Sequence, residues 1–315
     1  MIIYIVSDGK RGHLSQTQGL AQALIRCARQ RRPDLEHSCH EVSIVGKSWL
    51  SKLLYKGRDL DLPRPNLILC AGHGTHLAAL SLARHLRCLC MVCMRPSLPL
   101  RLFDLCIMPR HDLRPGEGDG GRIFSTIGAI NSIRPHPEIE KREKLILIGG
   151  PSREFDWDAE TVLNQLATIT RHSSSPMVLT TSRRTPSDFV QDVTTTCPSI
   201  RVEPVETTGP TWVADHLACA REVWVTQDSV SMVYEALSSG APVGLIEMPR
   251  KREYRKGKKK ASRVGRGLDM LVGDGCVRRF TEWAQDHVLP RPKEVLNEAE
   301  RAANYILDHF PKLLP

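Results

Sequence analysis

Long hydrophobic runs are missing from this sequence, and so is a recognisable export signal. No apolar stretch approaches the ~20 residues that a membrane-spanning helix requires. The chain opens with MIIYIVSDGK, which passes directly into a strand-like run and lacks the basic region and cleavage site of a signal peptide. We therefore expect a cytoplasmic protein.

Two glycine-based nucleotide motifs are also missing. The segment SDGKRGH (residues 7–13) does not match the G-x-G-x-x-G pattern of NAD-binding enzymes, and no Walker phosphate-binding loop occurs. These absences argue against NAD-dependent enzymes, including nucleotide-sugar epimerases that carry that fingerprint. They argue equally against P-loop NTPases.

Aromatic residues make up only 5% of the chain, which leaves few platforms for stacking nucleic-acid bases. The net charge of +9 comes from one segment, Arg250–Arg266, which holds ten Lys or Arg and one Glu. Because no nucleic-acid-binding motif accompanies this charge, we expect no nucleic-acid partner. We expect Arg250–Lys260 to be a mobile loop, which is either merely solvated or engages an anion such as a diphosphate or an anionic lipid surface.

The ten cysteines follow neither a disulfide pattern nor a metal-binding pattern. Cys70, Cys93 and Cys106 lie in apolar runs, where cysteine behaves as a small hydrophobic residue. Cys88, Cys90 and Cys93 are close together but lack a second group of ligands at metal-binding spacing. We therefore predict reduced cysteines and no metal site.

Apolar runs alternate with helical periodicity along the chain, which predicts an α/β fold with parallel sheets. A first series of strands is expected at Ile2–Val6, Glu41–Val45, Leu67–Ala71, Leu89–Met94 and Leu105–Met108, with helices at Leu14–Arg29 and Thr75–Leu86. A second series is expected at Leu145–Ile148 and Met177–Thr181, with helices at Ala159–Arg171 and Thr211–Cys219. The charged, proline-bearing stretch Asn131–Lys144 between the two series predicts a linker.

Residues 223–249, VWVTQDSVSMVYEALSSGAPVGLIEMP, complete the second series as strand, polar turn, helix and strand. The turn Thr226–Ser229 would place small polar groups and a helix N-terminus, which favours a phosphate, at the end of a parallel strand. Ser231 and Glu235 share a helix face, where they would offer a hydroxyl to a phosphate and a carboxylate to a ribose. The alternative is an ordinary crossover with a capped helix and an exposed Glu.

Ligands of parallel sheets bind at the carboxyl ends of the strands, so the residues that follow each strand are candidate site residues. In the first half these segments are SDGKRGH (7–13), GHGTH (72–76), RPS (95–97) and PRHD (109–112). His73 and His76 would suit a polar substrate or a metal, but no third metal ligand is evident. We predict that His13, His73 and His111 converge at this edge; plain glycine turns are the alternative.

The second half repeats this pattern. Gly149 and Gly150 follow one predicted strand, and Ser182, Arg183 and Arg184 follow the next. Small residues, hydroxyls and arginines at neighbouring strand ends suit the phosphates of a nucleotide.

These segments resemble segments of known protein families. The second half is similar to the donor-binding domain of glycosyltransferases of the B type, whose UDP-sugar-dependent members have a Gly-Gly turn, a serine-rich turn and a helix Glu that contacts ribose. The whole chain resembles the bacterial relatives of the plant "elongated mitochondria" fission protein. The matching segments are SDGKRGH, AGHGTH, RPSLPLRLFD, PRHD, IGGPSR, TSRRTP, TQDSVSMVYEAL and SSGAPVG.

The resemblance implies two Rossmann-like parallel-sheet domains that face a cleft, in the B-type glycosyltransferase fold. The first would comprise residues 1–135, completed by a C-terminal helix at 290–312, and would bind the acceptor. The second, residues 136–289, would bind a nucleotide-sugar donor. No cofactor and no metal are implied, because helix N-termini and arginines can stabilise the departing diphosphate.

Site residues follow from the same resemblance. The donor would be bound by Gly149, Gly150, Ser182, Arg183, Gln227, Asp228, Ser229, Ser231 and Glu235. The expected general base is His13, with His111 and Asp112 as further candidates. The predicted contacts to the acceptor or to phosphate are Lys10, Arg11, Gly12, His73, His76 and Arg263.

Two functions of different classes are therefore open. The first is the metal-independent transfer of a sugar from a nucleotide-sugar to a cytosolic or membrane-surface acceptor, by a cytoplasmic protein that the Arg250–Lys260 segment could hold peripherally at the inner membrane. The second is a non-catalytic adaptor that retains the fold, as the role of the plant relative in recruiting fission machinery implies.

Overall fold

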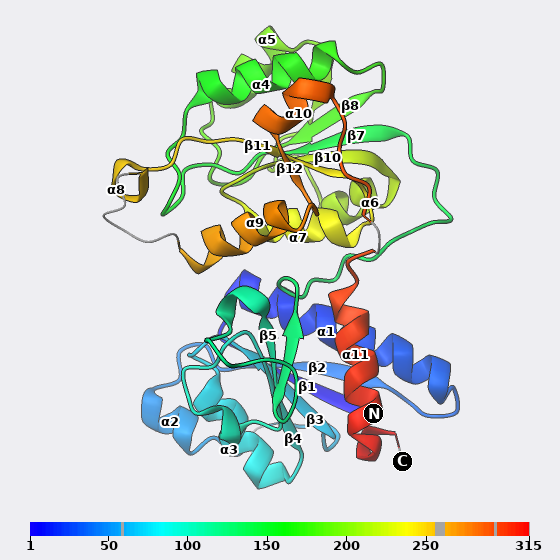
Figure 1. Ribbon diagram of the computed structural model, residues 1–315. Coiled ribbons are helices and arrows are strands. Elements are labelled where there is room, and N and C mark those ends of the chain that lie inside the picture. Colours follow the sequence, from blue (N-terminus) through cyan, green and yellow to red (C-terminus); the bar gives the residue numbers. More distant parts are fainter. Residues whose placement is uncertain (58–59, 256–261, 293–294, 315) are drawn as a thin grey trace. The chain divides into compact units, whose positions relative to one another are not determined.

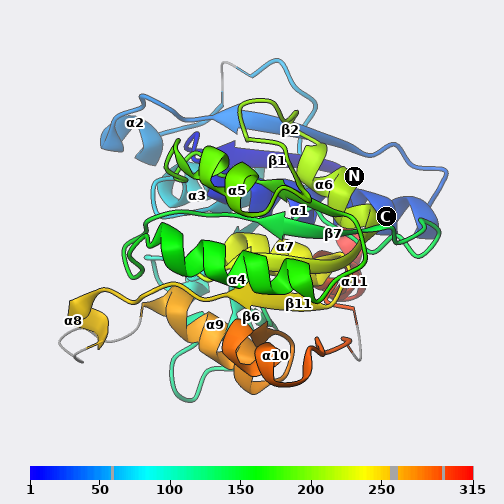
Figure 2. The same ribbon diagram turned by 90° about the horizontal axis from the view of Figure 1, so that it is seen from above.

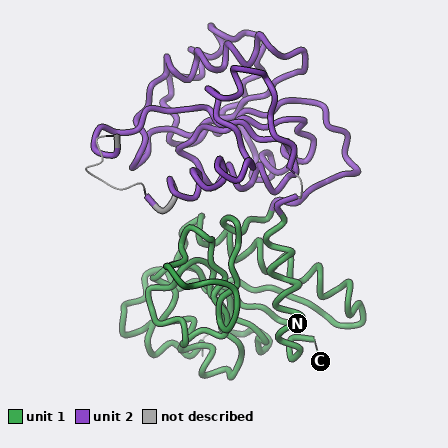
Figure 3. The backbone as a smooth tube through the Cα atoms, viewed as in Figure 1, with its two compact units in different colours: residues 1–132, 297–315 green, residues 133–296 purple. Residues whose placement is uncertain are grey.

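The computed structural model describes residues 1–57, 60–255, 262–292 and 295–314. The chain forms two compact units, each with its own sheet and core. Unit 1 comprises Met1–Ser132 and Asn297–Pro315, and unit 2 comprises Ile133–Leu296 (Figure 3). Each unit is described by itself.

Unit 1 contains a six-stranded sheet in the order β2-β1-β3-β4-β5-β6, with every neighbouring pair parallel. The strands are β1 (Ile2–Ser7), β2 (Ser38–Ser43), β3 (Leu67–Ala71), β4 (Leu89–Cys93), β5 (Leu105–Pro109) and β6 (Ile123–Thr126). The helices are α1 (Arg11–Arg31), α2 (Trp49–Leu53), α3 (His76–Leu86) and α11 (Glu298–His309), with short 3-10 turns η1 (Leu100–Leu102), η2 (Arg110–Asp112) and η3 (Pro311–Leu313).

Both faces of this sheet are buried, as the near-continuous apolar strands require. Along β1, Ile3 and Ile5 join the cluster that contains residues of α1 and α11, while Tyr4 and Val6 join the cluster that contains residues of α3. The C-terminal helix α11 lies beside α1 (Figure 1), where the Arg31 guanidinium donates to Asp308 at 2.6 Å. The last helix thus belongs to the core of unit 1.

Unit 2 contains a second six-stranded parallel sheet, in the order β12-β11-β10-β7-β8-β9. The strands are β7 (Glu143–Leu147), β8 (Met177–Thr180), β9 (Ile200–Val202), β10 (Ala220–Thr226), β11 (Val243–Ile246) and β12 (Arg278–Arg279). The helices are α4 (Ala159–Arg171), α5 (Phe189–Thr196), α6 (Trp212–Cys219), α7 (Val230–Ser238), α8 (Arg252–Arg255), α9 (Arg263–Gly273) and α10 (Phe280–Asp286).

Helices cover both faces of the second sheet (Figures 1 and 2). On one face, α4, α5 and α10 cover a core built around Trp224, Phe189 and Trp283. On the other face lie α7 and α9. The predicted α/β class with two Rossmann-like parallel sheets is therefore confirmed.

Two predicted helix boundaries were wrong. The segment after β1 is not a loop through His13: α1 begins at Arg11, so Arg11, Gly12 and His13 form its first turn. The final helix, predicted at 290–312, begins only at Glu298, where the Asn297 side chain accepts a hydrogen bond from the Glu300 N–H. In both cases the backbone conformation of the residues before the helix sets its first residue, and the spacing of apolar residues does not reveal that conformation.

Candidate functional site

In unit 2, hydrogen bonds hold together the ends of three adjacent strands, β10, β7 and β8. The Gly149 N–H donates to Thr226 Oγ1 at 2.7 Å, and the Gly150 N–H donates to Asp228 Oδ2 at 3.1 Å. The Ser182 hydroxyl donates to the Gly149 carbonyl at 3.0 Å. The structure therefore brings Gly149, Gly150, Ser182 and Asp228 together at the carboxyl edge of the sheet, where parallel sheets bind ligands.

An ion pair between an exposed arginine and a buried aspartate organises this edge. The Arg184 guanidinium lies 2.7 Å from Asp228 Oδ2 and donates to the Ser229 hydroxyl at 2.8 Å. The Asp228 side chain has no exposed surface, whereas that of Arg184 is 43% exposed. The second carboxylate oxygen, Asp228 Oδ1, is buried and has no hydrogen-bond partner among the described residues. The edge thus offers a ligand the exposed part of a cation that a buried carboxylate holds in place.

The organising arginine is Arg184, and the sequence analysis had selected Arg183. Both arginines are exposed, and the Arg184 guanidinium also donates to the carbonyls of Gly150 and Pro151. The adjacent pair was visible in the sequence, but which of two neighbouring side chains turns inward depends on the turn after β8. We therefore add Arg184 to the candidates, and the donor contact of Arg183 stays a prediction.

Both glycines of the Gly-Gly turn are required by close packing within the protein. A Cβ at Gly149 would lie 2.3 Å from Asp228 Oδ2, and a Cβ at Gly150 would lie 2.2 Å from the Arg184 carbonyl oxygen. Their N–H groups already donate within the protein. The turn therefore shapes the site rather than supplying free donors.

The alternative of an ordinary side-chain cap on α7 does not fit. Ser229 precedes α7 but makes no capping hydrogen bond with its side chain, and its hydroxyl accepts from Arg184 instead. Of the other predicted donor contacts, Gln227 is buried and its Oε1 accepts from the Met248 N–H at 3.3 Å, which is a structural role. Ser231 on α7 is exposed.

Glu235 on α7 is half-buried. Burial raises the pKa of its carboxyl from 4.5 to about 7, because the charged form loses its hydration. The alternative of a freely exposed helix Glu is therefore wrong. A desolvated carboxyl with such a pKa is the kind of group that ligand sites use.

In unit 1 the corresponding feature is a carboxylate–imidazole pair. His13 Nδ1 lies 3.1 Å and 3.2 Å from the two carboxylate oxygens of Asp8. The ring packs against Gly72 after β3, where a Cβ would lie 2.1 Å from His13 Cε1. With Nδ1 facing the carboxylate, Nε2 is the ring nitrogen left to handle a proton.

Asp8 was missed by the sequence analysis, although it lies five residues before His13 in SDGKRGH. Burial alone would raise its pKa, but the hydrogen bonds from His13 and from the Lys10 backbone, together with their charges, lower it overall. Asp8 therefore stays ionised and orients the imidazole. The Lys10 amine lies 3.8 Å from the same carboxylate.

His76 does not fit its predicted role as an acceptor or phosphate contact. It lies in the core at the start of α3, 1% exposed, with Nδ1 3.2 Å from the Ser97 hydroxyl and its ring edge-on to Phe103. Burial, with smaller contributions from His73 and His13, lowers its pKa to about 4. His73 is exposed in the same turn, so the two histidines do not form a matched metal pair.

The order of strands in the sheet supports the predicted convergence for two of the three histidines. His13 and His73 follow β1 and β3, which are neighbours in the sheet. His111 lies in η2 after β5, with β4 intervening, and its position beside the other two stays a prediction. The neighbouring Asp112 is buried, and its carbonyl accepts from Arg95 at 2.9 Å.

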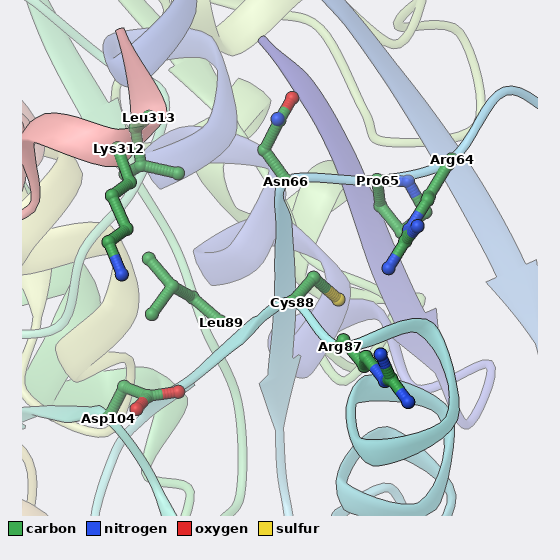
Figure 4. A pocket seen from close by; sticks show the side chains of 9 residues that line it. All are labelled: Arg64, Pro65, Asn66, Arg87, Cys88, Leu89, Asp104, Lys312 and Leu313. Carbon is green, nitrogen blue, oxygen red and sulfur yellow. The ribbon is translucent and has the colours of Figure 1, made fainter. Parts of the chain in front are cut away.

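A cavity of about 420 Å³ lies at the opposite edge of the unit 1 sheet (Figure 4). It is lined by residues that precede strands, namely Asn66 before β3, Cys88 before β4 and Asp104 before β5, together with three cationic side chains. None of the predicted site residues lines it. The candidate site therefore remains at the carboxyl edge.

Residues 256–261 of the basic segment lie outside the described residues, as does the side chain of Arg263. Where the segment begins, Arg250 pairs with Glu154 at 3.5 Å and with Asp269 at 3.3 Å, and α8 follows. The expectation of a wholly mobile loop is wrong at this first residue, because ion pairs to its own unit hold it. The proposed anion contact of Arg250–Lys260 stays a prediction.

A family model described as mitochondrial fission ELM1 matches residues 11–310. The chain belongs to this family. The resemblance noted in the sequence is therefore confirmed across nearly the whole chain. No curated protein matches this ELM1-family chain by sequence.

Solved structures of the following three proteins are similar to this ELM1-family chain. UDP-GlcNAc 2-epimerase from Methanocaldococcus jannaschii matches with a TM-score of 0.57 and 13% identity, covering 98% of this chain and 100% of the other. MurG from Acinetobacter baumannii matches with a TM-score of 0.51 and 12% identity, covering 99% of both chains. MnaA from S. aureus, solved with UDP, matches with a TM-score of 0.51 and 14% identity, covering 99% and 97%.

At these identities the likeness establishes the fold. The chain shares the B-type glycosyltransferase fold with glycosyltransferases and with UDP-GlcNAc 2-epimerases. The missing NAD fingerprint therefore does not exclude epimerases of this fold. No helix in the described part of the chain is both long and apolar enough to cross a membrane.

Proposed function

We propose that this ELM1-family protein transfers a sugar from a nucleotide-sugar donor to an acceptor hydroxyl, with the donor bound by unit 2. The observation that carries the proposal is the Arg184–Asp228 pair at the carboxyl edge of the second sheet. The fully buried Asp228 carboxylate fixes the guanidinium, and the exposed part of Arg184 would meet the phosphates of a bound donor. The solved complex of MnaA with UDP shares this fold.

The residues of unit 2 suit the parts of such a donor. The exposed part of the Arg184 guanidinium can pair with a diphosphate, and the hydroxyls of Ser182 and Ser229 flank it. Glu235 would accept hydrogen bonds from ribose hydroxyls. As the bond between the sugar and the diphosphate breaks, negative charge grows on the leaving nucleoside diphosphate, and a fixed guanidinium stabilises that charge.

Unit 1 would supply the acceptor side, with His13 as the general base. In the proposed step, His13 Nε2 takes the proton of the acceptor hydroxyl while the oxygen of that hydroxyl bonds to the anomeric carbon of the sugar. Asp8 holds the ring by Nδ1 and stabilises the imidazolium that forms. His111 and Asp112 remain further candidates, and Lys10, Arg11 and His73 are candidate contacts for acceptor or phosphate.

The proposal is tested by titrating the full chain with UDP, UDP-sugars and other nucleotides, in calorimetry and in thermal shift. A bound nucleotide at 100 times its Kd should stabilise the protein by about 2.7 kcal/mol. Arg184→Gln should weaken binding, whereas Arg171→Gln, an exposed arginine on α4, serves as a charge-matched control. Equal binding by both variants would contradict the placement of the donor.

A second candidate is an epimerase that acts on a nucleotide-sugar, and it rests on the shared fold of the 2-epimerases. It uses the same donor site but needs no acceptor. The third is the non-catalytic adaptor, which predicts either no nucleotide binding or binding without turnover. Product analysis separates the three functions.

A further inference from the structure

An apolar surface stands out on α2 and its flanks. Nine large hydrophobic side chains are exposed among the described residues, and five of them fall within ten consecutive positions. These five are Val45, Trp49, Leu50, Leu53 and Leu54, each between 41% and 67% exposed. No residue of α2 is buried. We call residues Val45–Lys56 the α2 surface.

The charge of the α2 surface has one sign. Lys47, Lys52 and Lys56 are interspersed with the apolar side chains, and no Asp or Glu occurs from Val42 to Gly57. Lys56 is exposed, and Lys47 reaches over the ring of Tyr55 at 4.8 Å. Exposed Trp and Leu mixed with lysines is the composition of a surface that lies in the interfacial region of an anionic bilayer.

The position of α2 leaves this surface accessible. The helix lies at the periphery of unit 1, beyond the end of β2 (Figures 1 and 2). Since β2 and β1 are parallel, α2 follows the same sheet edge as the turn that holds Asp8. A Cβ at Gly9 would lie 3.0 Å from Val45 Cγ2, so the α2 surface borders the Asp8–His13 pair directly.

We propose that the α2 surface docks unit 1 onto an anionic lipid bilayer, with Trp49 and the leucines entering the interface and the lysines contacting acidic headgroups. A second copy of the chain fits less well, because a two-fold contact would oppose the same lysines with no carboxylate between them. The docking does not depend on catalysis. If the transfer reaction proposed above also holds, the acceptor hydroxyl that reaches His13 would be carried by a membrane-borne molecule.

The test is cosedimentation of the full chain with phosphatidylcholine vesicles, with and without phosphatidylglycerol. We expect binding that requires the anionic lipid and weakens with salt. Replacing Trp49, Leu50 and Leu54 by Ser should lower the affinity by about tenfold or more, because apolar burial is lost. Leu102→Ser, at a site in unit 1 that is 49% exposed, is the matched control and should bind normally.

Two further variants keep the result decisive. The double variant Lys52→Gln, Lys56→Gln should bind anionic vesicles more weakly and leave binding to neutral vesicles unchanged. Replacing Lys258, Lys259 and Lys260 by Gln tests whether the basic segment, rather than the α2 surface, binds the vesicles. Unchanged vesicle binding of the triple Ser variant, or an equal loss in the Leu102→Ser control, would overturn the proposal. So would a wild-type protein that ignores vesicles but self-associates through Trp49, Leu50 and Leu54.

Discussion

The pKa of Glu235 predicts a pH-dependent gain in stability when its charge is removed. The ordinary value of 4.5 and the value of about 7 in the folded protein differ by about 2.5, and at ~1.36 kcal/mol per pKa unit the burial penalty is at most about 3 kcal/mol. Because the folded pKa is raised, the folded state binds the proton more tightly. The stability of unit 2 should therefore fall as pH rises from about 4.5 to about 7 and then level off.

Glu235→Gln should leave stability nearly unchanged at pH 4 and raise it at pH 8 by up to about 3 kcal/mol. Denaturant unfolding followed by tryptophan fluorescence is suitable, since four of the five tryptophans lie in unit 2. The exposed Glu206→Gln is the control. A variant that is less stable than the wild type at pH 8, or parallel pH profiles, would refute the reasoning.

Three other predictions concern the two strand edges. Arg184→Gln should destabilise unit 2 by about 1–3 kcal/mol in denaturant unfolding, because it leaves the buried Asp228 without its cation; no change would show that the pair is incidental. Gly149→Ala should cost about 1–3 kcal/mol by forcing a Cβ into Asp228 Oδ2, whereas Gly209→Ala, with open space around it, should be near neutral. Asp8→Asn should lower kcat for transfer by about 10²-fold or more with little change in donor Kd, and a selective rise in donor Kd would argue against an orienting role.

The architecture was largely predictable from local pattern. The strand β3 and the helix α4 have the predicted bounds, Leu67–Ala71 and Ala159–Arg171. In β3 every residue is apolar and buried, and in α4 the Asp158 side chain accepts from the Thr161 N–H as a cap at the predicted start. Where a periodic segment is bounded by clear turn or cap residues, sequence and structure agree.

The missed features depend on long-range packing or turn geometry. Lys10 precedes α1 without a capping side chain, so the sequence carried no signal that the helix starts at Arg11. His76 is in the core because α3 packs its first residue against Phe103, which is distant in sequence. Asp8 became visible as a site residue only through its contact with His13, and Arg184 was distinguished from Arg183 only by its contact with Asp228.

Sugar transfer by this protein can be measured by analysing the products formed from a panel of UDP-sugars and other nucleotide-sugars, with anionic vesicles and lipid extract as acceptor source. We expect release of the nucleoside diphosphate together with sugar linked to an acceptor, and loss of both products in the Arg184→Gln variant. A new nucleotide-sugar without released diphosphate would indicate an epimerase. Binding without any product, or no binding at all, would contradict the account and favour the adaptor.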